Sequence, residues 1–106
     1  WLRFKDNSFF FTFFNAIIYY IINFFMWQIA HRGHSQAYGD NNMNSFRQAV
    51  SAGFEMIELD IQLCGSGEIV VYHDIFIDKH YICHSDYNTL RNLGIILLEE
   101  VWMWNL

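Results

Sequence analysis

The sequence predicts an α/β fold that begins with a strand–helix–strand unit. An apolar segment at Trp27–Ala30 has the length of a short strand, and the stretch after it carries apolar residues at helical spacing, namely Met43, Phe46, Ala49 and Val50. Farther along, apolar and other side chains alternate with the period of a strand: Ile57, Leu59, Ile61 and Leu63 against Met56, Glu58, Asp60 and Gln62. Strand, helix and strand in this order make one β/α unit.

An apolar run precedes this unit. Residues 7–30 contain no charged side chain, and most of the stretch from Phe9 to Trp27 is Phe, Ile, Tyr, Met or Trp. Because about 20 apolar residues can cross a bilayer, we predict a transmembrane or signal-anchor helix at residues 1–26. The protein would then be a single-pass membrane protein of open orientation. No small-x-small site follows the run, which disfavours a cleaved signal peptide. The alternative is an apolar helix that caps the floor of the folded domain.

The first predicted strand leads directly into His31 and Arg32. In barrels of parallel strands, functional side chains stand at the carboxyl ends of the strands, and both residues have that position. Residues 33–39 form a polar loop, and Asn41 or Asn42 can cap the helix that follows.

The second predicted strand carries two carboxylates on one face. Successive side chains of a strand point to opposite faces, so the apolar set meets the outer helices while Glu58 and Asp60 point inward together. Burying isolated carboxylates is costly, and a hard divalent cation, Ca²⁺ or Mg²⁺, removes that cost by binding their oxygens. The alternative is that Glu58 and Asp60 lie on a solvated face of the strand.

A hairpin is predicted after this strand. Gly65 and Ser66 suit a two-residue turn with glycine first, and that turn would place Glu58 opposite His73. Directly opposed residues share a face of the sheet. This register would bring His73 to the carboxylates, whereas a slip of one residue would move it to the far face.

These polar groups come in a fixed order along the chain: His31-Arg32-Gly33, Asp40-Asn41, Glu58-Leu59-Asp60 and His73-Asp74. The arrangement resembles the glycerophosphodiester phosphodiesterase family, in which an Ala-His-Arg-Gly strand end, a Glu-Asn-Thr helix start, a Glu-Leu-Asp strand and a His-Asp pair recur. The matching stretch runs from about residue 29 to 74. Ile96–Val101 is also similar to the Leu-Glu-Glu-Val segment that opens the second helix of the family's barrel.

The resemblance implies a fold and an activity. The fold is a (β/α)8 TIM barrel, of which residues 27–106 would be the N-terminal part. The implied activity is a phosphoric diester hydrolase of lipid metabolism, which converts a glycerophosphodiester such as glycerophosphocholine to glycerol 3-phosphate and an alcohol.

Phosphodiester chemistry suggests a role for each group. His31 and His73 are the predicted catalytic pair, because histidine transfers protons near neutral pH. Arg32 is predicted to bind substrate, since its planar fork can grip two phosphate oxygens. Glu58 and Asp60 are the predicted ligands of a divalent cation that polarises the phosphoryl group.

The sequence also departs from the family pattern. Asp40 stands where glutamate is usual, Asn42 replaces threonine, and a third carboxylate ligand on the next barrel strand has no counterpart before Leu106. Closed barrels take roughly 250 residues, whereas this sequence has 106. We therefore interpret it as a fragment or as the product of a truncated gene.

Composition excludes other classes of function. The net charge of -5 and the lack of basic patches disfavour a nucleic-acid partner, and 54% hydrophobic residues disfavour a disordered chain. Cys64 and Cys83 have no metal-knuckle spacing, and we do not expect a disulfide between them. A polar connection at residues 78–92 contains potential zinc ligands at spacings that fit no zinc finger.

Three readings of the function remain open. The first is a membrane-anchored, metal-dependent phosphodiesterase represented by its N-terminal part. The second is a truncated, non-catalytic, membrane-anchored remnant. The third is a related phospholipase D-like lipid phosphodiesterase that uses the same pair of histidines.

Overall fold

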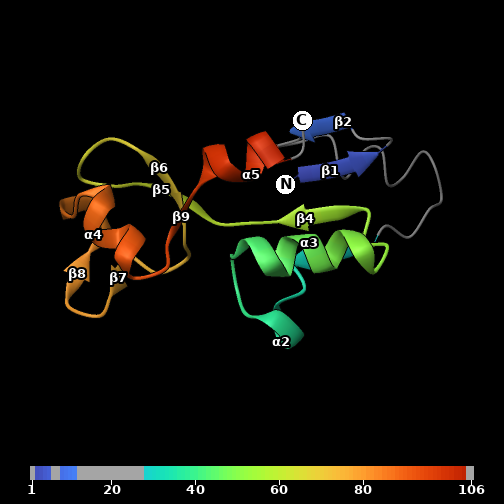
Figure 1. The fold of residues 1–106 in the computed structure, drawn as a ribbon, viewed down its shortest axis with the longest axis horizontal. Coiled ribbons are helices and arrows are strands. Elements are labelled where there is room, and N and C mark those ends of the chain that lie inside the picture. The colour runs from blue at the N-terminus through green and yellow to red at the C-terminus, as the bar shows by residue number, and fades with distance from the viewer. Residues whose placement is uncertain (1, 6–7, 12–27, 105–106) are drawn as a thin grey trace.

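The first sheet has four strands, in the order β2-β1-β4-β3. Figure 1 shows β2, β1 and β4 next to one another above α3. The structure is a computed structural model that describes residues 2–5, 8–11 and 28–104. The strands of this sheet are β1 (Leu2–Lys5), β2 (Ser8–Phe11), β3 (Ile29–His31) and β4 (Met56–Glu58). Strands β3 and β4 are parallel, and β1 pairs antiparallel with both β2 and β4.

The predicted strand–helix–strand unit is present. A single turn, α2 (Ser35–Tyr38), and the longer helix α3 (Met43–Ser51) connect β3 to β4. Asn42 is the N-cap of α3: its side chain accepts a hydrogen bond from the Ser45 backbone N–H at 2.8 Å, and the Ser45 hydroxyl accepts one from the Asn42 backbone N–H in return. This reciprocal capping satisfies two N–H groups that the helix itself leaves without partners.

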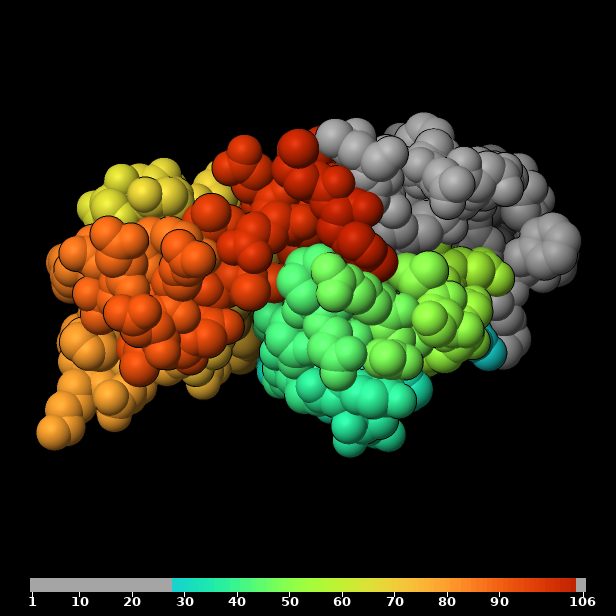
Figure 2. All heavy atoms as spheres, viewed as in Figure 1, coloured from blue at the N-terminus to red at the C-terminus, as the bar shows by residue number. Residues whose placement is uncertain are grey.

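The second sheet has three strands, in the order β5-β6-β9. They are β5 (Ile61–Leu63), β6 (Ile69–Val71) and β9 (Ile96–Leu97). The connection from β6 to β9 contains a small hairpin and two short helices, which are β7 (Phe76–Ile77), β8 (His80–Tyr81), the 3-10 turn η1 (Ile82–His84) and α4 (Tyr87–Asn92). Figure 2 shows this hairpin projecting from the rest of the surface. Helix α5 (Leu98–Trp104) follows β9.

Two apolar clusters hold these elements together. The first joins the β3–α3–β4 unit to the second sheet and to α5; its buried members are Ala30, Phe46, Ala49, Ile57, Val71 and Val101. The second lies between the second sheet and the connection from β6 to β9, and consists of Cys64, Val70, Ile82, Leu90 and Ile95. Because Val70 and Val71 point to opposite faces of β6, this one strand contributes to both clusters.

The alternating strand predicted for residues 56–63 is interrupted. Pairing with the first sheet ends at Glu58, and β5 begins at Ile61 in the second sheet. Leu59 packs against the first cluster as expected, but Ile61 and Leu63 are exposed rather than covered by helices. Met56 and Ile57 of β4 are both buried, so the predicted division into a covered apolar face and an inward face holds for Ile57 and Leu59 but not for Ile61 and Leu63.

The predicted hairpin register is wrong by one residue. Leu63 pairs with Ile69 and Ile61 with Val71, because three residues rather than two form the turn. The Cys64 N–H donates to the Glu68 carbonyl at 2.9 Å, and Gly67 closes the turn at a φ of 97°. This left-handed conformation suits glycine and is typical of three-residue hairpin loops. The predicted opposition of Glu58 and His73 is lost with the register.

The prediction of a single-pass membrane protein is also wrong. No helix among residues 2–5, 8–11 and 28–104 is long and apolar enough to cross a membrane. Ser8–Phe11, at the start of the apolar run, forms a strand paired with Leu2–Lys5. Phenylalanine favours strands as readily as it satisfies a hydropathy window, so length and hydropathy alone do not separate a strand from a helix at Ser8–Phe11. The rest of the predicted helix, residues 1, 6–7 and 12–26, lies outside the described residues.

Candidate active site

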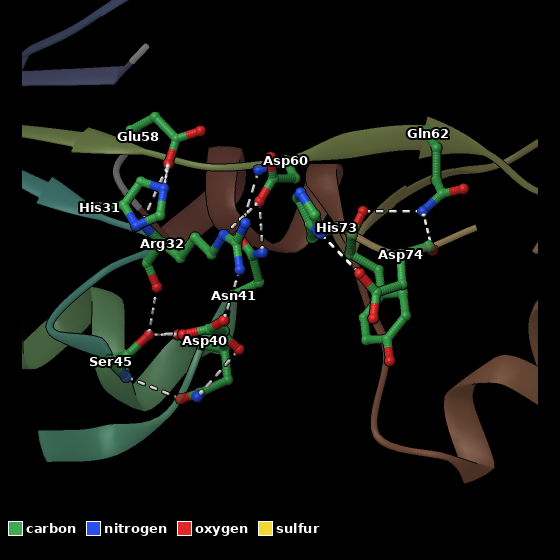
Figure 3. Close-up of polar contacts among 12 residues, drawn as sticks. His31, Arg32, Asp40, Asn41, Ser45, Glu58, Asp60, Gln62, His73 and Asp74 are labelled. Atoms are coloured by element: carbon green, nitrogen blue, oxygen red, sulfur yellow. Dashed lines mark hydrogen bonds and ion pairs between the residues drawn. The ribbon is translucent and has the colours of Figure 1, made fainter. Parts of the chain in front are cut away.

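Parallel pairing of β3 and β4 brings the first predicted residues together. His31 and Glu58 are partners in the register, each at the last position of its strand. His31 Nε2 lies 3.6 Å from Glu58 Oε2, and the imidazole is 70% exposed whereas the Glu58 side chain is 19% exposed. A solvent-accessible imidazole thus stands beside a largely covered carboxylate. Figure 3 shows the two side chains next to each other.

Arg32 links the two predicted carboxylates. Its backbone N–H donates to the Glu58 carbonyl at 2.8 Å and lies 3.2 Å from Glu58 Oε2. Its Nε forms an ion pair with Asp60 Oδ2 at 3.0 Å, although this N–H is not aligned for a hydrogen bond. Glu58 and Asp60 therefore share one side of the chain despite the change of sheet between them.

Asp40 occupies part of the Arg32 fork. Arg32 Nη1 donates to Asp40 Oδ2 at 2.9 Å. This hydrogen bond raises the pKa of Arg32; desolvation opposes the shift, and the negative charge of Asp60 adds to it. The guanidinium thus stays charged, but two of its three nitrogens already face carboxylates. Asp40 therefore competes with a substrate phosphate for Nη1, whereas Nη2 has no contact among the described residues.

Asn41 clamps Asp60 from the loop. Asn41 Nδ2 donates to Asp60 Oδ2 at 3.0 Å, and Asn41 Oδ1 accepts the Asp60 backbone N–H at 3.3 Å. The Asn41 N–H also donates to the Arg32 carbonyl at 2.9 Å. The residue is 6% exposed and has a φ of 52°, a left-handed value that asparagine tolerates better than most residues. Both the orientation and the backbone position of Asp60 thus depend on Asn41.

Gly33 allows α3 to approach the end of β3 closely. A Cβ added there would lie 2.3 Å from Ser45 Oγ and 2.9 Å from Phe46 Cδ1, and the φ of Gly33 is 85°. The close approach lets the Ser45 hydroxyl reach the Arg32 carbonyl at 3.3 Å. Helix α3 thereby supports the Arg32 backbone.

His73 and Asp74 form a pair on the other side of the site. His73 Nδ1 lies 2.7 Å from Asp74 Oδ1, and both side chains are more than half exposed. In the view of Figure 3, the His73 ring lies between Asp60 and Asp74. No contact joins His73 to Glu58 in the described part of the chain, which agrees with the shifted register.

The carboxylates fit a hard cation in ligand type but do not form a complete site. The partners of Glu58 are on Oε2 and those of Asp60 on Oδ2, which leaves Oε1 and Oδ1 without a protein partner among the residues described. Carboxylate oxygens of this kind suit Mg²⁺ or Ca²⁺. However, residues 28–104 and the two N-terminal strands contain no group of three or more metal-binding side chains.

Three supporting residues were not predicted as part of the site. The sequence pattern places Asp40 and Asn41 in the ordered motif and at a helix start without giving either a role in the site, and it gives no role to Ser45. One signal was present: of the adjacent pair Asn41 and Asn42, only one can be the N-cap. Asn42 is the N-cap, so the buried side chain of Asn41 has a different hydrogen-bond partner, which is Asp60.

A sequence model described as the glycerophosphoryl diester phosphodiesterase family matches residues 31–95. This chain belongs to that family. The match includes every residue assigned above to the candidate site, from His31 to Asp74. Family membership and the α/β barrel class predicted from the sequence are thereby confirmed.

Curated relatives support the same family. The chain is 49% identical to the uncharacterized protein YqiK of Bacillus subtilis, over 71% of this chain and 38% of YqiK. It is 44% identical to a glycerophosphodiester phosphodiesterase of Bacillus altitudinis, over 68% of this chain and 37% of that protein. The chain thus spans well under half the length of these relatives.

Solved structures of family members have the same fold. A glycerophosphodiester phosphodiesterase of Thermotoga maritima superimposes with a TM-score of 0.70 at 30% identity, over 74% of this chain and 39% of that one. An Oleispira antarctica phosphodiesterase, solved with its product sn-glycerol-3-phosphate, gives 0.59 at 29% identity, over 63% and 29% of the two chains. The described structure therefore corresponds to part of a family barrel.

Proposed function

We propose that this chain supplies part of the active site of a phosphodiesterase that hydrolyses glycerophosphodiesters to glycerol 3-phosphate and an alcohol, as a step of lipid metabolism. The observation that carries the proposal is the continuous set of contacts that gathers His31, Arg32, Glu58 and Asp60 at the ends of β3 and β4. The family segment is proposed to comprise residues 27–106.

The substrate phosphate would bind beside Arg32. Nη2, which has no partner in the described part of the chain, would donate to a phosphate oxygen while Nη1 remains on Asp40. Charge-assisted hydrogen bonds of this type are strong. If Asp40 were displaced by the substrate, Nη1 would also become available, and the two-pronged contact could form.

The two histidines would carry the proton transfers. Hydrolysis requires that a proton leave the attacking hydroxyl and that another reach the leaving oxygen. Asp74 holds Nδ1 of His73, so the ring is oriented to use Nε2. His31 is the more exposed of the two rings. Which histidine is the acid is left open.

A divalent cation, Mg²⁺ or Ca²⁺, would be held by Glu58 and Asp60, each of which has one carboxylate oxygen without a partner among residues 28–104. When bound, such an ion offsets negative charge on the phosphoryl group. Asn41 and Arg32 keep the other oxygen of Asp60 in place, which fixes the direction in which the free oxygen points.

The proposal is tested by assaying release of glycerol 3-phosphate from glycerophosphocholine. We expect His31→Ala and His73→Ala to lower kcat about 100-fold or more, the typical contribution of one acid–base group. His84→Ala is the matched control, because His84 is an exposed histidine that contacts none of the site residues and should leave the rate unchanged. Adding EDTA should abolish turnover, and excess Mg²⁺ or Ca²⁺ should restore it.

Three outcomes would contradict the proposal. Full activity of His31→Ala would show that His31 takes no part in proton transfer, contrary to the proposed mechanism. Absence of any turnover in the unmodified protein, with the metal supplied, would favour the non-catalytic remnant. Release of the head group from a membrane phospholipid, with no turnover of soluble glycerophosphocholine, would indicate the phospholipase D-like reading.

A further inference from the structure

Gln62 makes a contact that the proposed mechanism has not used. The residue is the middle position of β5, and its backbone pairs with Val70. Its side-chain Nε2 donates to two backbone carbonyls farther along the partner strand, to Tyr72 at 2.9 Å and to Asp74 at 2.8 Å. The amide nitrogen has two hydrogens to donate, so both are used.

The two acceptors lie on either side of His73. Regular pairing of β6 ends at Val71, and the last backbone bond of this hairpin runs from the Tyr72 N–H to the Asp60 carbonyl at 3.0 Å. Beyond Tyr72, the chain leaves the ladder. The side-chain amide of Gln62 continues the hydrogen bonding beyond the paired strands. It donates to the Tyr72 and Asp74 carbonyls, which no longer have a backbone N–H of β5 opposite them.

We infer that Gln62 is a positioning residue that holds the His73–Asp74 pair in the geometry needed for proton transfer. This inference rests on the function proposed above for His73. The side chain of Gln62 fixes the backbone on both sides of the imidazole, and Asp74 fixes the ring through Nδ1. Figure 3 shows the three residues together, with the dashed contacts running from Gln62 to this segment.

The predicted consequence concerns rate rather than binding. An error of about 1 Å in the placement of a catalytic group can cost about 100-fold in rate. Because Gln62 contacts neither Arg32 nor the carboxylates, its loss should spare the groups that bind the phosphate. Gln62→Leu, which keeps the approximate size but donates no hydrogen bond, should lower kcat about 10- to 100-fold and change KM less than twofold.

The test combines kinetics with NMR spectra of the protein labelled with ¹³C at its five histidines. In Gln62→Leu, we expect the imidazole signals of His73 to shift or broaden while those of His31 and His84 remain in place. Gln62→Asn keeps the amide on a side chain too short to reach both carbonyls, and should give a smaller effect of the same kind. Gln28→Leu is the control, since Gln28 is exposed beside the opposite end of β3.

Each result has a defined meaning. Unchanged His73 signals in Gln62→Leu, or equal changes at all histidines in both Gln62 variants, would overturn the inference. If Gln62→Leu does not fold, the Gln62→Asn spectrum decides. If the unmodified protein shows no turnover, the proposed function fails, but the His73 signals still decide whether Gln62 positions this ring.

Discussion

Asn41 meets two requirements that few other residues could meet together. Its backbone adopts a left-handed conformation, and its side chain provides a donor and an acceptor to Asp60. Glycine would satisfy only the first requirement, and glutamine, with its longer side chain, is poorly suited to both. The residue therefore connects backbone geometry to the orientation of a proposed metal ligand.

Two substitutions should separate these requirements. Asn41→Gly keeps the backbone conformation but removes the clamp, and should reduce the free energy of unfolding by about 1–3 kcal/mol, the usual cost of losing buried hydrogen-bond partners. Asn41→Ala should cost about 1–2 kcal/mol more, because a Cβ disfavours the left-handed region. Urea denaturation measures both. Equal stability of the two variants would show that the left-handed backbone relaxes without cost.

At the level of single residues, much of the site was predictable from the sequence. His31, Arg32, Glu58 and Asp60 lie at strand ends, where side-chain period and strand direction determine position. The orientation of His73 was not predictable in the same way, because it depends on a register that one extra turn residue changes. Asn41 was missed because its partner lies 19 positions away in sequence.

Among the elements, α4 shows how one side chain can make a helix end sensitive to pH. Asp86 is its N-cap and accepts the Thr89 backbone N–H at 2.8 Å. That hydrogen bond, with a second from the Thr89 side chain, lowers the pKa of Asp86 from its ordinary value of 3.8. The folded protein therefore binds this proton less tightly than the unfolded chain does.

The sign of the pH dependence follows by linkage. The stabilisation from Asp86 is complete above about pH 3.8 and is lost as the pH falls through the lower folded value. The stability difference between the unmodified protein and Asp86→Ala should therefore shrink between pH 6 and pH 3 in urea titrations. Asp86→Asn caps without titrating, so its advantage over Asp86→Ala should stay constant. If the stability difference between the unmodified protein and Asp86→Ala also stays constant with pH, the assignment of Asp86 as a titrating N-cap is refuted.

The hairpin between β5 and β6 marks the limit of prediction for elements. Both strands and the turn were expected, and both strands are present. The turn type was not decided by composition, because glycine stands at both position 65 and position 67. Gly67 adopts the left-handed conformation, which makes the loop three residues long, and the loop length sets the register of β5 against β6.

On the scale of the whole molecule, the first apolar cluster joins the two sheets. Val71 of β6 is 1% exposed and packs with Ile57 of β4 and Val101 of α5. Leu59, in the segment that passes from one sheet to the other, packs on the same cluster. The two sheets are thus joined by a packed apolar core and not only by the chain segment that runs between them.

Val71→Ala should therefore weaken the entire fold. Loss of two buried methyl groups leaves a small cavity and should lower the free energy of unfolding by about 2 kcal/mol. Val50→Ala is the matched control: Val50 is 40% exposed on α3, and its substitution should cost much less. Thermal denaturation of the two variants compares them, and equal losses would mean that Val71 is not part of a shared core.

The same packing governs the distance between the two histidines. His31 ends a strand of the first sheet, whereas His73 follows a strand of the second, only two residues after Val71. Neither ring contacts the other's sheet through a polar bond in the described residues. The distance between the two imidazole rings is thus set by apolar packing between the sheets. An apolar substitution in that core, remote from any substrate, would change this distance and with it the proton transfers proposed for the two rings.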